Sequence, residues 1–253
     1  MTIVTLAGGL ASTVFAPIVA ALLSVLDWRM TFLVLAAVLA AVTIPLHALF
    51  LERSWMPRES DHQAGEEHTV RSVTRTRSFW FLEVSMVATT VALYSVTLAA
   101  IPLFTEKGLT FELAAVGLGL LGAGQVVGRL LFVALPKATK PWVPMVIVAA
   151  LSAVLLAALA LTPGPAWLLI LVGVIAGAVR GAQTLVQGSA VADRWGTRNY
   201  GAINGAFAAP ITITAALAPA IGPALAAGVG SFSVMAIIMA CVAAVAVLAA
   251  RWS

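Results

Sequence analysis

Charged residues are scarce in this sequence, since Asp, Glu, Lys and Arg together make up only 9% of its 253 residues. A soluble domain carries roughly 25%. Hydrophobic residues account for 62% of the chain, and the mean hydropathy is +1.06. The chain therefore has too little polar surface for a soluble enzyme or a disordered tail.

Cysteine is almost absent as well. The single Cys241 lies in an apolar run, so a disulfide framework is excluded, and with it a small secreted disulfide scaffold. The formal net charge is +4, but the basic residues sit in short gaps between apolar runs. That distribution is typical of membrane topology and does not indicate a nucleic-acid-binding surface.

Long apolar runs make up most of the sequence. A helix crosses the bilayer core with roughly 20 apolar residues, and backbone polar groups in lipid must be satisfied within the helix. Runs of this length predict an all-α polytopic bundle of eight transmembrane helices. They cover residues 3–25, 31–51, 79–104, 113–135, 143–161, 167–190, 203–226 and 231–250.

The loops between these runs alternate in charge. Ten basic residues fall in one set of loops, while the opposite set holds only Arg29 and Lys107. Positive-inside bias predicts that the basic set and both termini are cytoplasmic, in a multi-pass protein of the plasma (inner) membrane. All seven tryptophans lie near predicted span ends, as an aromatic belt requires. The basic set is Arg53, Arg58, Arg71, Arg75, Arg77, Lys137, Lys140, Arg194, Arg198 and Arg251.

One connection is long and polar, and it divides the spans unevenly. Residues 52–78 predict a cytoplasmic linker that two spans precede (1–51) and six follow (79–253). Bundles built from repeats divide evenly. We therefore expect that four spans are missing from the front of the first half.

Several segments resemble the major facilitator superfamily. LAGGLASTVFAPIVAALLSVLDWRMTFLVLAA is similar to the fifth and sixth spans of that family, and TRTRSFWFLE to the start of the seventh. GLGLLGAGQVVGRLLF resembles the eighth span, and ADRWGTRNYGAINGAF the turn between the tenth and eleventh. The resemblance implies spans five to twelve of a secondary transporter that moves a small solute by alternating access between two halves. The family's acid- and arginine-bearing loop has only a degraded counterpart in FVALPKATKPW.

Three Asp, Glu, Lys or Arg side chains lie inside the predicted spans, where each costs about 2.5–3.5 kcal/mol on insertion scales. Arg180 stands 13 residues past Trp167, about 20 Å along a helix. Gln183, Thr184 and Gln187 follow it on the same helical face. This polar stripe predicts a cavity wall; the alternative is that Arg180 extends to the cytoplasmic headgroups.

Arg129 has Gln125 one turn before it. In the resemblance, Arg129 matches the eighth-span arginine that binds a carboxylate in the monocarboxylate and oxalate/formate branches. Gln125 stands where the monocarboxylate branch has an acid. Arg129 either binds a solute or anchors the inner end of its span.

Glu83 shares a helical face with Thr90, Tyr94 and Thr97. Its carboxyl either carries a coupling proton or pairs with a basic loop residue such as Arg77. Further along, Asn204, Thr212 and Thr214 with Pro210 and Pro219 predict a polar, breakable span that lines a cavity, although a threonine can also bond back to its own helix.

One enzyme-like string is present. Residues 66–71, EEHTVR, match the EExxxR pattern of membrane-embedded prenyl-protein proteases. Such an enzyme needs its acids and further histidines inside spans, but this string lies in the polar loop. A solvated charge run is the simpler interpretation.

We therefore predict a secondary transporter of a small solute, an organic anion moving with a proton. Two alternatives are a non-transporting fragment of a transporter and a membrane-embedded hydrolase. We expect no catalytic residue, metal or cofactor, no nucleic-acid partner, and a monomer in the lipid bilayer. The candidate proton-coupling residue is Glu83. The candidate substrate-binding residues are Arg180, Gln183, Thr184, Gln187, Arg129, Gln125, Tyr94 and Asn204.

Overall fold

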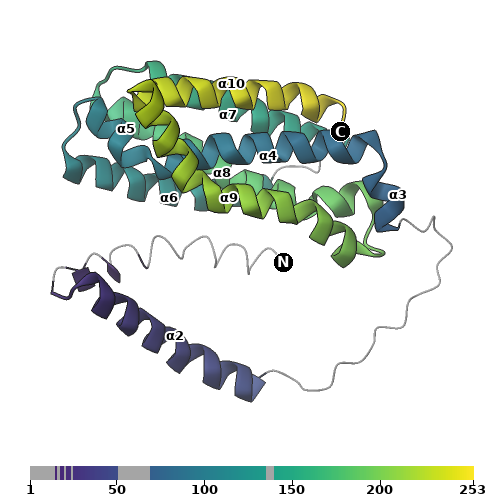
Figure 1. Cartoon of the computed structure of the whole chain (residues 1–253), viewed down its shortest axis with the longest axis horizontal. Helices are drawn as coiled ribbons and strands as arrows, with labels where there is room; N and C mark the ends of the chain where they lie inside the picture. The colour runs from purple at the N-terminus through teal and green to yellow at the C-terminus, as the bar shows by residue number, and fades with distance from the viewer. Residues whose placement is uncertain (1–14, 16–17, 20, 24, 51–68, 135–139) are drawn as a thin grey trace. The chain divides into compact units, whose positions relative to one another are not determined.

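The structure is a computed structural model that describes residues 15, 18–19, 21–23, 25–50, 69–134 and 140–253 (Figure 1). The chain divides into two compact units, residues 13–66 and residues 1–12 with 67–253. Each unit is described by itself. The described residues are helical, with no strand among them.

The smaller unit contains helix α2, Trp28–Phe50. Asp27 precedes it and caps it, since its Oδ1 accepts from the backbone N–H of Met30 at 2.7 Å. Within the helix, Thr43 donates to the carbonyl of Leu39 at 2.5 Å, which satisfies the hydroxyl inside an otherwise apolar segment. At 23 residues, α2 is long enough to cross a bilayer.

The larger unit contains six more helices of spanning length. With α2, seven described helices are long and apolar enough to cross a membrane, so the expectation of a polytopic all-α protein is confirmed. Most of the first predicted run, 3–25, lies outside the described residues. The six helices are α4 (Arg77–Leu98), α6 (Phe111–Ala134), α7 (Val143–Leu161), α8 (Ala166–Trp195), α9 (Tyr200–Val229) and α10 (Phe232–Arg251).

The prediction of one uninterrupted span over 79–104 is wrong. Helix α4 ends at Leu98, and a separate helix α5, Ala100–Glu106, follows after Ala99. Pro102 explains the position, because a proline ring clashes with the carbonyl four residues earlier, here that of Leu98. In α5 the same proline falls in the first turn, where a missing N–H costs little.

A short helix, α3 (Val70–Thr74), precedes α4. Thr69 and Ser72 form a capping box at its start, with each side chain bonded to the other's backbone N–H. The indole of Trp80 donates to the carbonyl of Thr74 at 2.8 Å, which fixes α3 against the beginning of α4.

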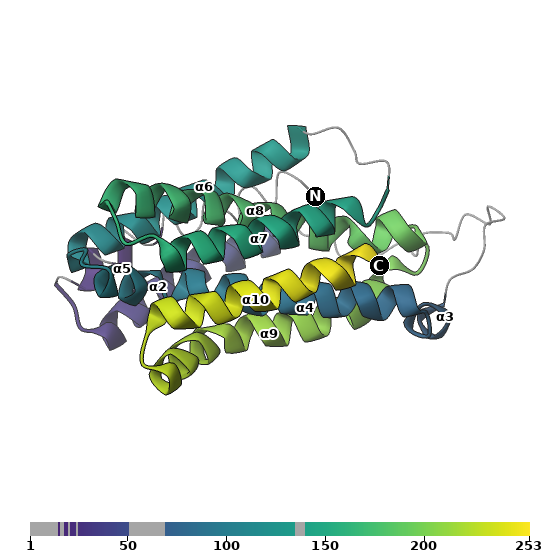
Figure 2. The same ribbon diagram turned by 90° about the horizontal axis from the view of Figure 1, so that it is seen from above.

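Helix α4 lies between α9 and α10, while α7 packs on α10 and α6 packs on α8 (Figures 1 and 2). The contact between α6 and α8 depends on glycine. A Cβ on Gly177 would lie 2.1 Å from the carbonyl oxygen of Leu121, and one on Gly181 would lie 2.1 Å from that of Gln125. The two backbones therefore approach as closely as small residues allow.

Six tryptophans of the described residues lie at or near helix ends. They are Trp28, Trp80, Trp142, Trp167, Trp195 and Trp252. Trp142 and the guanidinium of Arg251 stack at 4.3 Å, joining the start of α7 to the end of α10. These positions suit the headgroup level of a bilayer.

Adjacent charges hold the opposite end of the larger unit together. The carboxylate of Glu106 accepts hydrogen bonds from Ser231, Phe232 and Ser233 at the start of α10. Burial would raise the pKa of Glu106, but these bonds outweigh it and lower the pKa to about 2. The neighbouring Lys107 donates to the carbonyls of Ala160 (2.8 Å) and Thr162 (2.9 Å) at the end of α7. Each charge thus meets the helix terminus of opposite polarity.

Candidate functional site

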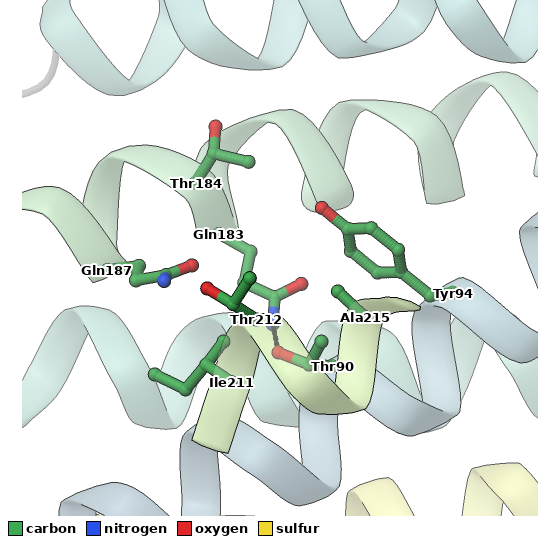
Figure 3. Close-up of a pocket in the computed structure, with 8 residues that line it drawn as sticks. All are labelled: Thr90, Tyr94, Gln183, Thr184, Gln187, Ile211, Thr212 and Ala215. Carbon is green, nitrogen blue, oxygen red and sulfur yellow. Dashed lines mark hydrogen bonds between the residues drawn. The ribbon is translucent and has the colours of Figure 1, made fainter. Parts of the chain in front are cut away.

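A cavity of about 180 Å³ lies between α4, α8 and α9 (Figure 3). Its lining includes five polar side chains and one tyrosine. So many polar groups would be unusual on a surface that faces only lipid. The lining residues are Thr90, Tyr94, Gln183, Thr184, Gln187, Ile211, Thr212 and Ala215.

Arg180 is held beside this cavity by the aromatic ring of Tyr94. The guanidinium carbon lies 3.9 Å from the ring centre, a close cation–π contact. One terminal nitrogen, Nη1, donates to the hydroxyl of Thr97 at 3.0 Å. The Nε atom is buried and has no hydrogen-bond partner among the described residues. Two residues of α4, Tyr94 and Thr97, therefore position the guanidinium, and its Nε–H remains a donor without a described acceptor.

Gln183 stands one turn further along α8 and points at α4. Its amide nitrogen donates to the hydroxyl of Thr90 at 2.8 Å (Figure 3). The same nitrogen lies 3.8 Å from the sulfur of Met86. The amide oxygen is buried without a partner in the described part of the chain. A buried acceptor without a donor is costly, and such groups occur where a ligand or water completes the site.

Arg129 reaches the same wall from α6. Its Nε donates to the hydroxyl of Thr184 at 3.3 Å, and Thr184 donates in turn to the carbonyl of Gly181 at 2.7 Å. Arg129 is buried. Two arginines from different helices thus contact residues that line one cavity: Arg129 contacts Thr184, and Arg180 contacts Tyr94.

The sequence profile of the Major Facilitator Superfamily matches residues 1–179. The chain belongs to this superfamily. It is a multi-pass membrane protein and a membrane transporter of the major facilitator kind, a family whose members are generally not enzymes. No curated protein matches the sequence.

In this major facilitator transporter, Glu83 lies apart from the cavity lining. The side chain is only 4% exposed, and neither carboxylate oxygen has a hydrogen-bond partner among the described residues. The alternative of an ion pair with Arg77 is not seen, because Arg77 is exposed at the first position of α4 while Glu83 is buried.

Four predicted substrate-binding residues of the transporter do not line the cavity: Arg129 and Arg180, which contact lining residues, and Gln125 and Asn204. Gln125 on α6 and Asn204 on α9 are half-buried, and neither belongs to the wall. Helix α9 is not broken at its prolines and runs unbroken from Tyr200 to Val229. The hydroxyl of Thr212 donates to the carbonyl of Ala208 at 2.8 Å, so it bonds back to its own helix while it borders the cavity.

Sequence reasoning missed the apolar part of the wall. Ile211 and Ala215 are one turn apart on α9 and line the cavity together with Gln183 and Thr90 (Figure 3). Aliphatic residues on a spanning helix carry no signal of their own. Only the polar neighbour Thr212 indicates that this face of α9 borders a cavity.

The enzyme-like string at 66–71 lies mostly outside the described residues. Elsewhere, no group of three or more His, Cys, Asp or Glu side chains that could hold a metal ion is found among the residues the structure describes.

Proposed function

We propose that this transporter moves a small organic anion by secondary transport, with the cavity between α4, α8 and α9 on the solute path. The observation that carries the proposal is the placement of Arg180, whose guanidinium is stacked on a residue of the cavity wall and has a buried nitrogen without a partner among the described residues. A charge at this depth is costly, so it is retained where it binds something.

The charge of the site supports an anion. A guanidinium presents donors in a planar fork that matches a carboxylate. Arg129 adds a second cation bonded to the wall residue Thr184, and none of the described residues that line the cavity is acidic. Gln187 and the hydroxyl of Thr90 add neutral polar groups to the same surface.

The size of the site supports a small solute. The cavity has a volume of about 180 Å³. Drug-sized pockets are larger, at roughly 300–1,000 Å³. A short-chain mono- or dicarboxylate therefore suits this cavity better than a large amphipathic compound does.

We propose Glu83 as the site of a coupling proton. An ionised carboxylate buried without a partner is strongly unfavourable, and a bound proton removes that charge. Glu83 lies on α4, the helix that also carries Thr90, Tyr94 and Thr97 at the candidate site. A change in water access to this helix during alternating access would then couple proton binding to solute movement.

The proposed orientation places the basic loops and both termini in the cytoplasm, with the protein in the plasma (inner) membrane. In the larger unit, Arg71, Arg75 and Arg77 lie at the same end as Arg194 and Arg251. The spans in 79–253 would form one half of an alternating-access pair, with 1–51 belonging to the other half.

Uptake by the full chain in liposomes tests the proposed function. Radiolabelled short-chain mono- and dicarboxylates are supplied outside, and uptake is compared between the parent chain and Arg180→Gln. We expect a loss of at least tenfold, because one hydrogen-bonded ionic contact is worth about 1.5–3 kcal/mol. Arg71 is exposed on α3, so Arg71→Gln is the matched control and should retain parent uptake.

Two results would contradict the proposal. Unchanged uptake of organic acids by Arg180→Gln would exclude Arg180 from solute binding. No flux of any acid from the parent chain, with recovery when four further spans are supplied, would favour the non-transporting fragment.

A further inference from the structure

A shallow groove lies between α4 and α10 in the larger unit and shares no lining residue with the candidate site. It has a volume of about 460 Å³. The serine hydroxyl of Ser85 donates to the carbonyl of Ala246 at 2.9 Å beneath it, so the two helices that form its walls are fixed to each other. The groove is lined by Arg77, Phe81, Val245, Leu248, Ala249 and Trp252.

Along α10, the lining of the groove changes from aliphatic side chains to a tryptophan at the helix end. On α10, Val245, Leu248 and Trp252 follow at i, i+3 and i+7 and therefore share one face. This face extends about 10 Å along the axis, at 1.5 Å per residue. Val245 and Leu248 lie within the residue range of α10, whereas Trp252 is its C-cap residue.

The opposite wall repeats this arrangement. Arg77 is the first residue of α4, and Phe81 follows one turn later on the same face. The groove thus has Arg77 and Trp252 at the ends of the helices, and apolar side chains along the rest of its length. Arg77 is exposed, and no bond or ion pair of its side chain is recorded among the described residues.

The described charged residues around the groove are mostly basic. Seven basic residues stand at this end of the larger unit among the described residues, and Asp193 is the exposed acid there. The seven are Arg71, Arg75, Arg77, Lys140, Arg194, Arg198 and Arg251. Because the protein is embedded in a membrane, the molecules that meet this face at helix-end depth are phospholipids.

We propose that the groove between α4 and α10 is a binding site for an anionic phospholipid. The headgroup phosphate contacts the Arg77 guanidinium, Trp252 lies at the level of the glycerol backbone, and an acyl chain covers Phe81, Val245 and Leu248. A zwitterionic lipid brings its own cationic group to a surface that is already positive, so the site selects a lipid of net negative charge. This inference is independent of the proposed solute.

Native mass spectrometry of the full chain tests the site. The protein is released from mixed micelles that contain equal amounts of phosphatidylglycerol and phosphatidylcholine, and the lipid-bound fraction is counted for each lipid. We expect the parent chain to retain phosphatidylglycerol preferentially. Arg77→Gln should lower this preference about fivefold, because one arginine near a membrane surface contributes about 1 kcal/mol.

Arg71→Gln is the matched control, since it removes an equal charge from the same end of the protein but does not line the groove. It should keep most of the preference. If Arg71→Gln and Arg77→Gln lower the preference equally, attraction is spread over the whole basic surface and the groove is not a site.

A second variant tests the apolar part of the groove without touching the charge. Val245→Trp adds a bulky side chain at an exposed position of the groove, where it should fill the space of an acyl chain and lower the bound fraction of phosphatidylglycerol. Unchanged binding in Val245→Trp would overturn the proposal. So would displacement of the lipid by inorganic phosphate alone, because that result would indicate a simple anion site.

Discussion

The guanidinium carbon of Arg180 on α8 lies 3.9 Å from the ring centre of Tyr94 on α4. The two residues are 86 positions apart in the sequence. Tyr94 also lines the cavity, whereas Arg180 is not part of the lining and donates to the hydroxyl of Thr97. The ring therefore fixes the position of the cation against a lining residue of the cavity.

We expect Tyr94→Leu to weaken solute binding, because it removes the aromatic face under Arg180. A desolvated cation–π contact contributes about 0.5–2 kcal/mol, which corresponds to a roughly two- to thirtyfold rise in the half-saturation concentration for uptake. Tyr94→Phe keeps the ring and is the matched control. A similar rise in both variants would show that the hydroxyl, and not the ring, matters.

Helix positions in 77–253 could be predicted from sequence because each span combines an apolar run with tryptophan or basic residues near its ends. The predicted 143–161 coincides with α7, Val143–Leu161. The break at Ala99 was missed because the sequence stays apolar across it, from Leu98 to Phe104. Pro102 was the available signal, since it forbids a regular helix across the carbonyl of Leu98.

The candidate site was predictable only in its polar part. Spacing at i, i+3, i+4 and i+7 places Arg180, Gln183, Thr184 and Gln187 on one face of α8, and three of these line the cavity. The partners of this face could not be found in the same way. Which residue of α4 meets Gln183 depends on how the two helices cross, and a single sequence carries no information on that.

Helix α8 should be intolerant of a methyl group at Gly177. A Cβ there would lie 2.1 Å from the carbonyl oxygen of Leu121, so α6 and α8 would have to separate. We expect Gly177→Ala to lower the free energy of unfolding by about 1–3 kcal/mol, as overpacking does. Thermal unfolding in detergent measures the change.

Gly188→Ala provides the comparison on the same helix, because a Cβ at Gly188 meets no atom within 4 Å. There the higher helix propensity of alanine should leave the melting temperature unchanged or raise it. Equal losses in the two variants would mean that close packing of α6 on α8 does not explain the glycines.

Glu83→Gln should separate solute binding from proton coupling. Glutamine has nearly the same shape but cannot bind and release a proton, so uptake should no longer accelerate when an inward proton gradient is imposed. Solute exchange without a gradient should persist. Liposome uptake with and without the gradient measures both, and Glu112→Gln, an exposed acid, is the control. An unaltered response to the gradient would remove Glu83 from the mechanism.

Acid should weaken the larger unit at the start of α10. The pKa of Glu106 is about 2 in the folded protein, below its ordinary value of 4.5, because Ser231, Phe232 and Ser233 donate to its carboxylate. A group whose pKa is lowered by folding stabilises the protein fully above its unfolded pKa, and loses that effect as the pH falls towards the folded pKa.

Glu106→Gln should therefore lower the melting temperature at neutral pH, and the difference from the parent should shrink as the pH falls from about 4.5 to about 2. The charge of Glu106 is largely exposed, so solvent screening keeps the effect modest. Glu112→Gln, which removes an acid from the first turn of α6, should show a smaller loss, because no comparable set of backbone and hydroxyl donors converges on it in the described residues. A melting difference for Glu106→Gln that stays constant with pH would mean that the carboxylate's shape, and not its charge, holds the start of α10.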